Sequence, residues 1–519
     1  MKKFLNLPLV GSANVLKAIG AAALLLLFAS QAAGADGLDI SATVHTPQLE
    51  HITQQELNRL VEFNLDPHAA FERAFEVGDA LFATAGNELD GVGANVGNGS
   101  RFAKHPRVDL SAPREWANHF PARVTGPNSQ ACNECHFRPS EDGSGPVSAN
   151  NVRDPQRTGD IGMFITRQPP HVFGIGAKQL LAEEMTQELH LIRDLALQQA
   201  SASAHKVKAD LIAKGIDFGS IAANPDGSLD FKKVGGVDDD LIIKPLQWKG
   251  ANFTIRDFVR GAENNELGLQ AVEIVGSGED GDFDQIIDEL TVGDITALAI
   301  YQAAQPRPVT KTELADLGLF DLSAQEKEQI AVGETIFTTV QCATCHVPEL
   351  HLNSSIFSEP SRSAAYRDQS FPSGDDPQAL GLTPRAAVSF DLTQDIPENM
   401  IVLESGRKVS LGNFKKIGSQ TIVNIFSDLK RHDLGKNVAE PVDEVGTGPS
   451  VFITQPLWGA GSTAPYMHDG RSPTITDAIL QHGGEAAASR KQFVHLSDED
   501  KKALVAYVEN QILFKQAEE

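Results

Sequence analysis

Cysteine is scarce in this chain of 519 residues, which contains four in all. They form two pairs of identical spacing, each followed at once by a histidine: Cys132-Asn133-Glu134-Cys135-His136 and Cys342-Ala343-Thr344-Cys345-His346. Since no cysteine lies outside these two motifs, a disulfide framework is excluded as the source of stability. Stability must therefore come from a packed core and from whatever the motifs bind.

Basic side chains are also few, with 44 Lys and Arg against 69 Asp and Glu and a net charge of −25. This balance argues against nucleic acid as a partner and suits a small basic protein. Long apolar runs are equally scarce. The clearest is residues 18–29, which is too short for a comfortable membrane span, so no stable span is expected.

That apolar run has the surroundings of a secretory signal. Three lysines precede it, namely Lys2, Lys3 and Lys17, and the small-residue sequence Ala33-Gly34-Ala35 follows it. Residues 1–35 are therefore predicted to be a signal peptide, with an uncleaved anchor as the alternative. The prediction places the mature protein in the periplasm.

The Cys-x-x-Cys-His motif is the signature of covalent c-type haem attachment. Two thiols one helical turn apart reach the two vinyl groups of one porphyrin, and the adjacent histidine becomes the proximal ligand of the iron. A zinc ribbon or a redox dithiol would explain the cysteines but not the histidines. We therefore expect two covalently bound haems c, on Cys132, Cys135 and His136 and on Cys342, Cys345 and His346. Export agrees, because c-type haem is attached outside the cytoplasm.

The sequence predicts the same pair of helices around each motif. One helix leads to the motif, and a second helix packs across the first. In the second copy, Ser323 and Glu326 form a capping box for the leading helix, and Gly333 would allow close helix contact. The closing helix begins at Ser497 and is expected to carry apolar residues as far as Ile512.

The first copy repeats this pattern, with Gly78 on the leading helix and a closing helix opened at residues 290–294. We predict a mainly α fold with two c-type cytochrome domains, long loop insertions and little sheet. The domains are expected at 36–310 and 320–519, with a linker at about 305–321. Three segments rich in small and polar residues are expected to be loops, some with short strands: 86–130, 215–240 and 352–395.

Four stretches carry a family resemblance. The most specific runs from Pro456 to Glu485 and contains Pro465-Tyr466-Met467-His468-Asp469-Gly470, and the others are residues 169–176, 256–268 and 290–294. Over about residues 65–514 the chain resembles the bacterial di-haem cytochrome c peroxidase superfamily. It is most similar to the di-haem oxidoreductase branch, whose members are labelled peroxidase-like or thiol-oxidoreductase-like.

The resemblance implies a second axial ligand for the C-terminal haem. The position fourteen residues after His468 carries that ligand in the superfamily, and here it is His482. Met467 is the alternative, although it occupies a variable position of the family motif. A bis-histidine haem would have a lower potential than a His/Met haem and would suit an electron relay.

The resemblance also makes the N-terminal haem, on His136, the one that reacts with peroxide or oxygen. Residues 137–170 contain no histidine, so this haem is either open or capped from elsewhere; the candidates for a cap are His105, His119 and His171. Residues 264–267 resemble the segment that carries the family's distal glutamate. Glu266 is therefore the expected catalytic acid/base, with Glu263 next.

Thr463 and Pro465 match positions whose carbonyls bind calcium between the haems in the family, so a calcium ion is a possible further cofactor. Asn150 or Asn151 would supply another ligand. Arg471 is expected to pair with a haem propionate or with Asp469.

The implied activity is that of a periplasmic oxidoreductase using peroxide or oxygen. Its electrons would come from a small periplasmic electron-transfer protein or a small-molecule donor. Two alternatives remain: a non-catalytic di-haem electron carrier, and an oxidase of a bulky organic or protein substrate.

Overall fold

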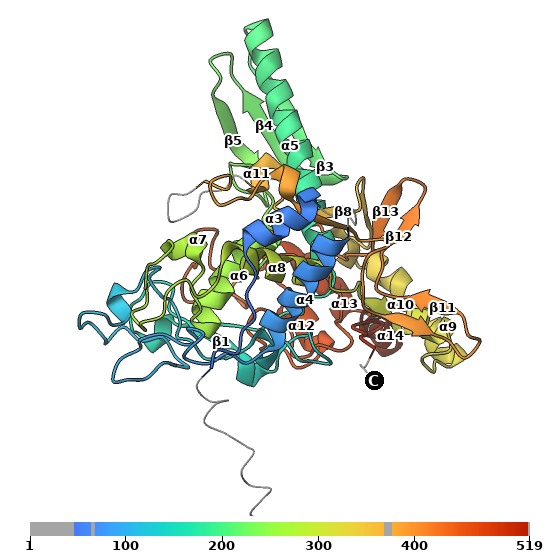
Figure 1. Cartoon of the computed structure of the whole chain (residues 1–519). Helices are drawn as coiled ribbons and strands as arrows, with labels where there is room; N and C mark the ends of the chain where they lie inside the picture. Colours follow the sequence, from blue (N-terminus) through green and yellow to red (C-terminus); the bar gives the residue numbers. More distant parts are fainter. Residues whose placement is uncertain (1–45, 64–67, 368–375, 517–519) are drawn as a thin grey trace, which may run out of the picture. The chain divides into compact units, whose positions relative to one another are not determined.

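The computed structural model describes residues 46–63, 68–367 and 376–516, which Figure 1 draws in colour. The predicted signal peptide lies outside the described residues. None of the described helices combines the length and the apolar character needed to cross a bilayer.

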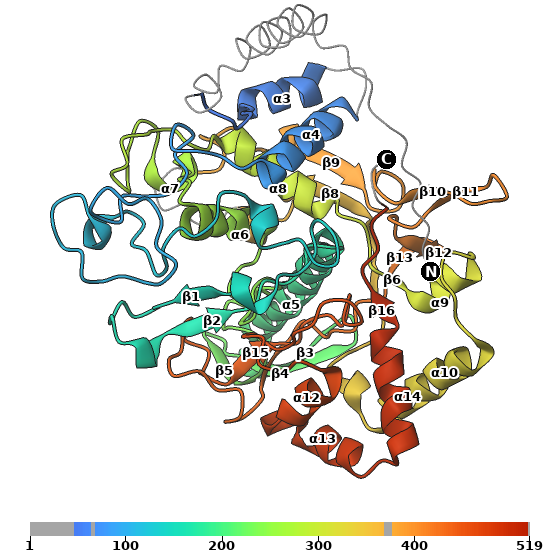
Figure 2. The same cartoon turned by 90° about the horizontal axis from the view of Figure 1, so that it is seen from below.

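The fold is mostly helical with small sheets (Figures 1 and 2). The helices of the described residues are α3 (Gln54–Phe63), α4 (Ala69–Ala83), α5 (Ile175–Ser203), α6 (Ile255–Ala262), α7 (Val272–Val275), α8 (Val292–Ala303), α9 (Lys311–Asp316), α10 (Ala324–Thr339), α11 (Ala364–Arg367), α12 (Ile475–Gln481), α13 (Ala487–Val494) and α14 (Asp498–Glu509). The strands are β1 (Asn151–Arg153), β2 (Ile165–Arg167), β3 (Val207–Ala213), β4 (Ile216–Ala223), β5 (Leu229–Val234), β6 (Val309–Thr310), β7 (Leu350–Leu352), β8 (Ile356–Glu359), β9 (Val388–Asp391), β10 (Met400–Val402), β11 (Lys408–Ser410), β12 (Lys415–Ile417), β13 (Gln420–Val423), β14 (Arg431–Asp433), β15 (Val451–Ile453) and β16 (Gln511–Ile512).

Helices α4 and α8 form the first predicted pair. Thr291 caps α8, and its side chain and that of Asp294 make a reciprocal capping box. A Cβ on Gly78 of α4 would overlap the carbonyl oxygen of Ala297 in α8, so only glycine permits this approach. The predicted leading and closing helices of the first copy are confirmed.

Helices α10 and α14 form the second pair, and they lie side by side in Figure 2. The capping box of Ser323 and Glu326 is present, as predicted. Gly333 of α10 packs against the backbone of Ala503 in α14. The predicted C-terminal extent of the closing helix is wrong, because α14 ends at Glu509 and Ile512 lies in β16. There it pairs with Val309 of β6, within the predicted linker.

Replacement of Gly333 by alanine tests this close contact. Alanine favours an exposed helix by about 1 kcal/mol, but here its methyl group would collide with the Ala503 carbonyl. We expect Gly333→Ala to lower the free energy of unfolding by about 1–3 kcal/mol in urea denaturation of the holoprotein. Val332→Ala, on the exposed side of the same turn, should change it by less than about 0.5 kcal/mol. Equal effects of the two variants would contradict the contact.

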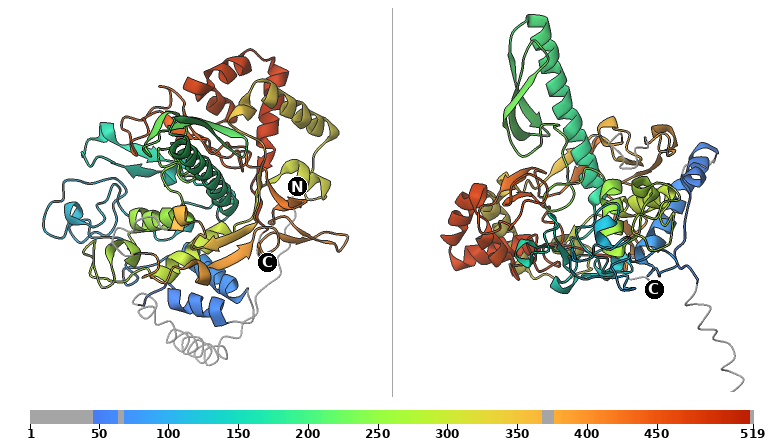
Figure 3. Two further views of the ribbon diagram at one scale, coloured as in Figure 1. Left: turned by 90° about the horizontal axis from the view of Figure 1, so that it is seen from above. Right: turned by 90° about the vertical axis from the view of Figure 1, so that its left-hand side faces the viewer.

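The sheets have two or three strands each. The largest departure from the sequence prediction lies at residues 215–240, where the loop expected to hold at most short strands contains β4 and β5. These strands form an antiparallel sheet in the order β3-β4-β5, which lies along α5 in both views of Figure 3. The prediction allowed short strands here but not a three-stranded sheet, because hairpin strands whose outer side chains are polar resemble loops in composition.

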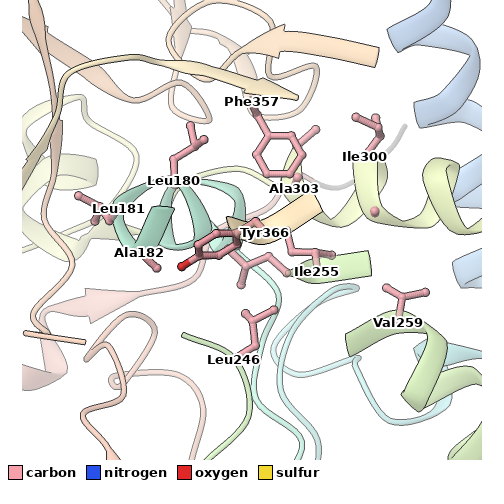
Figure 4. Packing of buried hydrophobic residues seen from close by; sticks show 14 of the residues in the cluster. Leu180, Leu181, Ala182, Leu246, Ile255, Val259, Ile300, Ala303, Phe357 and Tyr366 are labelled. Atoms are coloured by element: carbon pink, nitrogen blue, oxygen red, sulfur yellow. The ribbon is translucent and has the colours of Figure 1, made fainter. Parts of the chain in front are cut away.

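The main hydrophobic core joins α4, α5, α6 and α8 to strands from the second half of the chain. Figure 4 shows Leu180, Phe357 and Tyr366 converging in it. The Tyr366 hydroxyl donates to the carbonyl of Ile243 at 2.6 Å, so its polar end is satisfied inside the core. A separate cluster around Phe337 and Tyr507 holds the α10–α14 pair together.

Candidate functional site

Both Cys-x-x-Cys-His motifs open into one continuous cavity of about 540 Å³. Each motif begins with a single 3₁₀ turn, Cys132–Glu134 in the first and Cys342–Thr344 in the second. In each turn the histidine amide donates to the carbonyl of the first cysteine at 3.0 Å. This turn brings the two thiols and the imidazole of one motif to the same cavity wall, as porphyrin attachment requires.

Three cavity histidines are held in the same way. The Nδ1 atoms of His136, His346 and His482 lie 3.2, 3.1 and 2.8 Å from backbone carbonyl oxygens, those of Gly143, Phe426 and Ala478 respectively. When Nδ1–H donates to a carbonyl, Nε2 keeps its lone pair and becomes the metal-binding atom. Burial lowers the pKa of all three imidazoles, that of His346 to about 4, so they are neutral at pH 7.

His482 faces His346. It caps the C-terminus of α12, and the two ring centroids are 6.4 Å apart with their planes at 58°. A metal atom bonded to both rings at about 2.0 Å would place the facing nitrogens about 4 Å apart. Each ring centroid lies behind its nitrogen, so the two centroids would be farther apart than the nitrogens. Their expected separation is close to the 6.4 Å found here. The residues of the second motif therefore fit a metal centre with histidine on both sides.

Met467, the alternative ligand, also borders this cavity. It lies in the turn closed by the hydrogen bond from the Gly470 amide to its carbonyl, where its φ is 73°. The ring that faces His346 is that of His482.

The first motif is approached by acidic residues from another part of the chain. Beyond α6, the backbone widens into a π-helical turn over Glu263–Leu267, a distortion that often marks functional sites. Glu266 sits in this turn and borders the cavity, with 23 % of its side chain exposed. Its Oε1 accepts a hydrogen bond from the Asn151 amide and lies 3.8 Å from Arg153.

The other carboxylate oxygen of Glu266, Oε2, is buried and has no hydrogen-bond partner. Burial raises the pKa of Glu266 to about 7, against the opposing charges of Arg153 and Arg123. A carboxyl group with this pKa can both accept and donate a proton near neutral pH.

Glu263 has a different environment. Its Oε1 accepts the thiol hydrogen of Cys132 at 3.6 Å, and burial raises its pKa to about 8. Cys132 would lose this hydrogen on forming a thioether with haem. Glu263 therefore lies beside the position where haem would be attached to the first motif. Both glutamates border the cavity, and Glu266 is the one with a carboxylate oxygen that is buried without a partner.

The three candidate capping histidines are placed differently. His105 is exposed, and His119 packs between Trp116 and Phe283 away from the cavity lining. His171 does border the cavity, where its Nε2 lies 3.0 Å from the Trp458 carbonyl. Its Nδ1 is buried without a partner. Of the three, His171 alone is positioned to reach a group bound in the cavity.

The possible calcium ligands Thr463 and Pro465 border the cavity. Asn150 donates its amide to the carbonyl of Asp469 at 3.1 Å, which ties it to the loop that holds them, and its Oδ1 is buried and unpartnered. Asn151 instead gives its amide to Glu266. Arg471 pairs with Asp469, the second of the two partners expected for it.

Two sets of contacts were not expected from the sequence. Asn151 and Arg153 reach Glu266 from the β1–β2 hairpin, which has no motif of its own. His432 lies beside the second motif, with its ring nitrogens 2.8 Å from carboxylate oxygens of Asp428 and Glu485. These contacts outweigh burial and raise the pKa of His432 to about 11, so it carries a positive charge there.

Comparison with known proteins found a match to one family model and similarity to solved structures. Residues 402–511 match the family model described as "Di-haem oxidoreductase, putative peroxidase". No curated protein matches the chain. A solved structure described as a MauG-like protein associated with microbial copper homeostasis is similar at 14 % identity, over 64 % of this chain and 88 % of that one, with a TM-score of 0.26. The similarity to the di-haem oxidoreductase family thus covers residues 402–511 of this chain.

Proposed function

We propose that this protein is a periplasmic di-haem c-type oxidoreductase that uses hydrogen peroxide at the first motif, with the second motif serving as electron relay. The observation that carries the proposal is the asymmetry of the two motifs. Opposite His346 stands a second imidazole, whereas the cavity near the first motif holds Glu266 with a free carboxylate oxygen. In this proposal the centre at the second motif is closed on both faces by histidine. The centre at the first motif works beside Glu266 as acid/base.

The chain's own residues fit the two groups. Cys132, Cys135 and His136 would hold one haem, and a second set would hold the other: Cys342, Cys345, His346 and His482. Haem bound in this way supplies peroxide binding and electron transfer. Calcium bound by the carbonyls of Thr463 and Pro465, with Asn150, remains part of the proposal.

Glu266 moves the proton in this proposal. Its Oε2 takes a proton from the peroxide oxygen nearer the first motif and returns it to the other oxygen, which leaves as water when the O–O bond breaks with electrons that the haems would supply. Asn151 and Arg153 fix Oε1 and so orient the free oxygen. Both also favour the ionised carboxylate, which keeps the pKa from rising further above neutrality.

His346 and His482 have the complementary task of excluding other ligands. Both are buried and neutral, and each is oriented by a backbone carbonyl. A centre closed in this way exchanges electrons without binding peroxide. The net charge of −25 would draw a small basic donor protein to the surface.

Peroxide consumption by the purified holoprotein tests the proposal. The protein is produced with its signal peptide in cells that attach c-type haem, and covalent haem is counted after denaturation. We expect two haems per chain and consumption of hydrogen peroxide that depends on a reduced basic cytochrome c or a small-molecule donor. Two haems without consumption under either donor would contradict the proposal and favour an electron carrier.

The pH dependence of the peroxide reaction follows from the pKa of Glu266, which is about 7. The base is the ionised form, which becomes populated as pH rises through this pKa, so the rate constant should rise between about pH 6 and pH 8 and then level off. Stopped-flow measurement of the reaction with peroxide gives this profile. A rate that falls over the same range would contradict the role of Glu266 as base.

A further inference from the structure

A second cluster of acidic side chains lies in the loop between α7 and α8. Within residues 276–289, Asp280, Asp282 and Asp284 follow one another at every second position, and their carboxylate oxygens lie within 4.8 Å of one another. The cluster is not part of the cavity lining described above. It therefore needs an explanation separate from the two haem motifs.

Asp282 is the residue that points to a ligand. Its relative exposure is 0 %, and neither carboxylate oxygen has a hydrogen-bond partner. A buried carboxylate without partners is strongly unfavourable unless a cation or a proton compensates it. Since its neighbours in the cluster are themselves acidic, the free oxygens of Asp282 face a region rich in oxygen acceptors.

The neighbouring carboxylates are held in place by backbone amides. Asp280 accepts from the amides of Asp284 at 3.2 Å and Gln285 at 3.0 Å, and Asp284 accepts from that of Ile286 at 2.7 Å. Glu289 accepts from the Gln270 amide at 2.7 Å, and its charge acts on Asp282. These bonds fix the carboxylates while leaving lone pairs for a further partner.

The charges around the cluster do not cancel. Four carboxylates, those of Asp280, Asp282, Asp284 and Glu289, face two guanidinium groups. Arg101 pairs with Asp284, and Arg123 acts on Asp282 without a direct bond. With all four carboxylates ionised, the remaining charge of −2 equals that which a divalent cation would neutralise.

We propose that Asp280, Asp282 and Asp284, with the charge of Glu289 nearby, form a calcium-binding site. Carboxylate oxygens alternating along a loop are the preferred ligands of this hard cation, and Asp-x-Asp-x-Asp is the spacing that calcium loops use. In such loops the sixth position needs a left-handed backbone, and here Gln285 takes that position with a φ of 81°. Mg²⁺ is disfavoured, because it demands rigid octahedral geometry and retains most of its waters.

The site would support the segment that carries Glu266. Arg123, next to the cluster, donates to the carbonyls of Asn264 and Asn265 in the π-helical turn. The Asn95 amide donates to the Asp282 carbonyl at 3.3 Å, which joins the loop to the preceding insertion. Calcium would therefore hold three segments together behind the first motif, whatever reaction that motif performs.

Calcium counting on matched variants tests the proposal. Holoprotein is stripped with a chelator and dialysed against Ca²⁺, and bound calcium is measured by elemental analysis together with the unfolding temperature. We expect Asp282→Asn to bind one Ca²⁺ fewer per chain than the natural sequence and to lose the rise in unfolding temperature that Ca²⁺ causes. Counting the difference separates this site from calcium at Thr463 and Pro465. Asp239→Asn, which removes an exposed charge, should change neither quantity.

A second variant decides the matter if Asp282→Asn does not fold. Asp280 is only half-buried, and Asp280→Asn is expected to raise the calcium dissociation constant at least about tenfold. Calcium binding equal to that of the natural sequence in both variants, or in Asp280→Asn alone when the other is unfolded, would overturn the proposal. The cluster would then be neutralised by protons, since burial and the neighbouring acids raise the pKa of Asp282 to about 8.

Discussion

Glu266→Gln is expected to lower kcat/KM for hydrogen peroxide by about 100- to 10,000-fold while both covalent haems remain attached. Glutamine keeps the size of the side chain and can still bond Asn151, but it cannot accept the peroxide proton. The effect should fall on the reaction of the protein with peroxide and not on the supply of electrons. Stopped-flow mixing of oxidised protein with peroxide, followed by steady-state assays, measures both.

The control for this variant is Glu404→Gln, in the exposed turn between β10 and β11, which should leave the rate unchanged. The pH dependence gives a second check, because the rise of the rate through about pH 7 should vanish in Glu266→Gln. Full activity of Glu266→Gln together with loss of activity in Glu263→Gln would transfer the role to Glu263.

His482→Ala is the second change with a large expected effect. Its ring is the one that faces His346, so its removal should abolish the low-spin ferric signal of the second haem and leave the first unchanged. Covalent haem content should stay at two, because the cysteines and His346 are untouched. Electron paramagnetic resonance of the oxidised variant measures the change.

His482→Met adds a graded test of the same assignment. Methionine can ligate iron from the same position, so a low-spin signal should be retained, and the reduction potential of the second haem should rise relative to the bis-histidine form. His205→Ala, at an exposed position, serves as the control. A spectrum of His482→Ala identical to that of the natural sequence would exclude His482 as the ligand.

Local signals in the sequence predicted the helical framework. Ser323 with Glu326 fixed one helix start, and Gly78 and Gly333 marked both close helix contacts, because capping and steric approach depend on a few neighbouring residues. The end of α14 was missed, since Ile512 suits a helix and a strand equally well.

The residues of the candidate site also divide into those with a local signal in the sequence and those without one. The attachment residues follow from the motif alone, whereas His482 and Glu266 came from the family resemblance. The role of Asn151 and Arg153 beside Glu266 could not be predicted, because they reach it through a tertiary contact across more than a hundred residues of chain. The spacing of Asp280, Asp282 and Asp284 was visible in the sequence. Only the burial of Asp282, however, separates a site from an ordinary acidic loop.

The most direct test of the account is low-temperature electron paramagnetic resonance of the oxidised holoprotein before and after addition of hydrogen peroxide. We expect one high-spin and one low-spin ferric signal, with the high-spin signal lost on addition of peroxide. That result would assign an open centre to His136 and a closed one to His346 and His482. Two low-spin signals that do not respond to peroxide would contradict it, because neither centre could then bind the substrate.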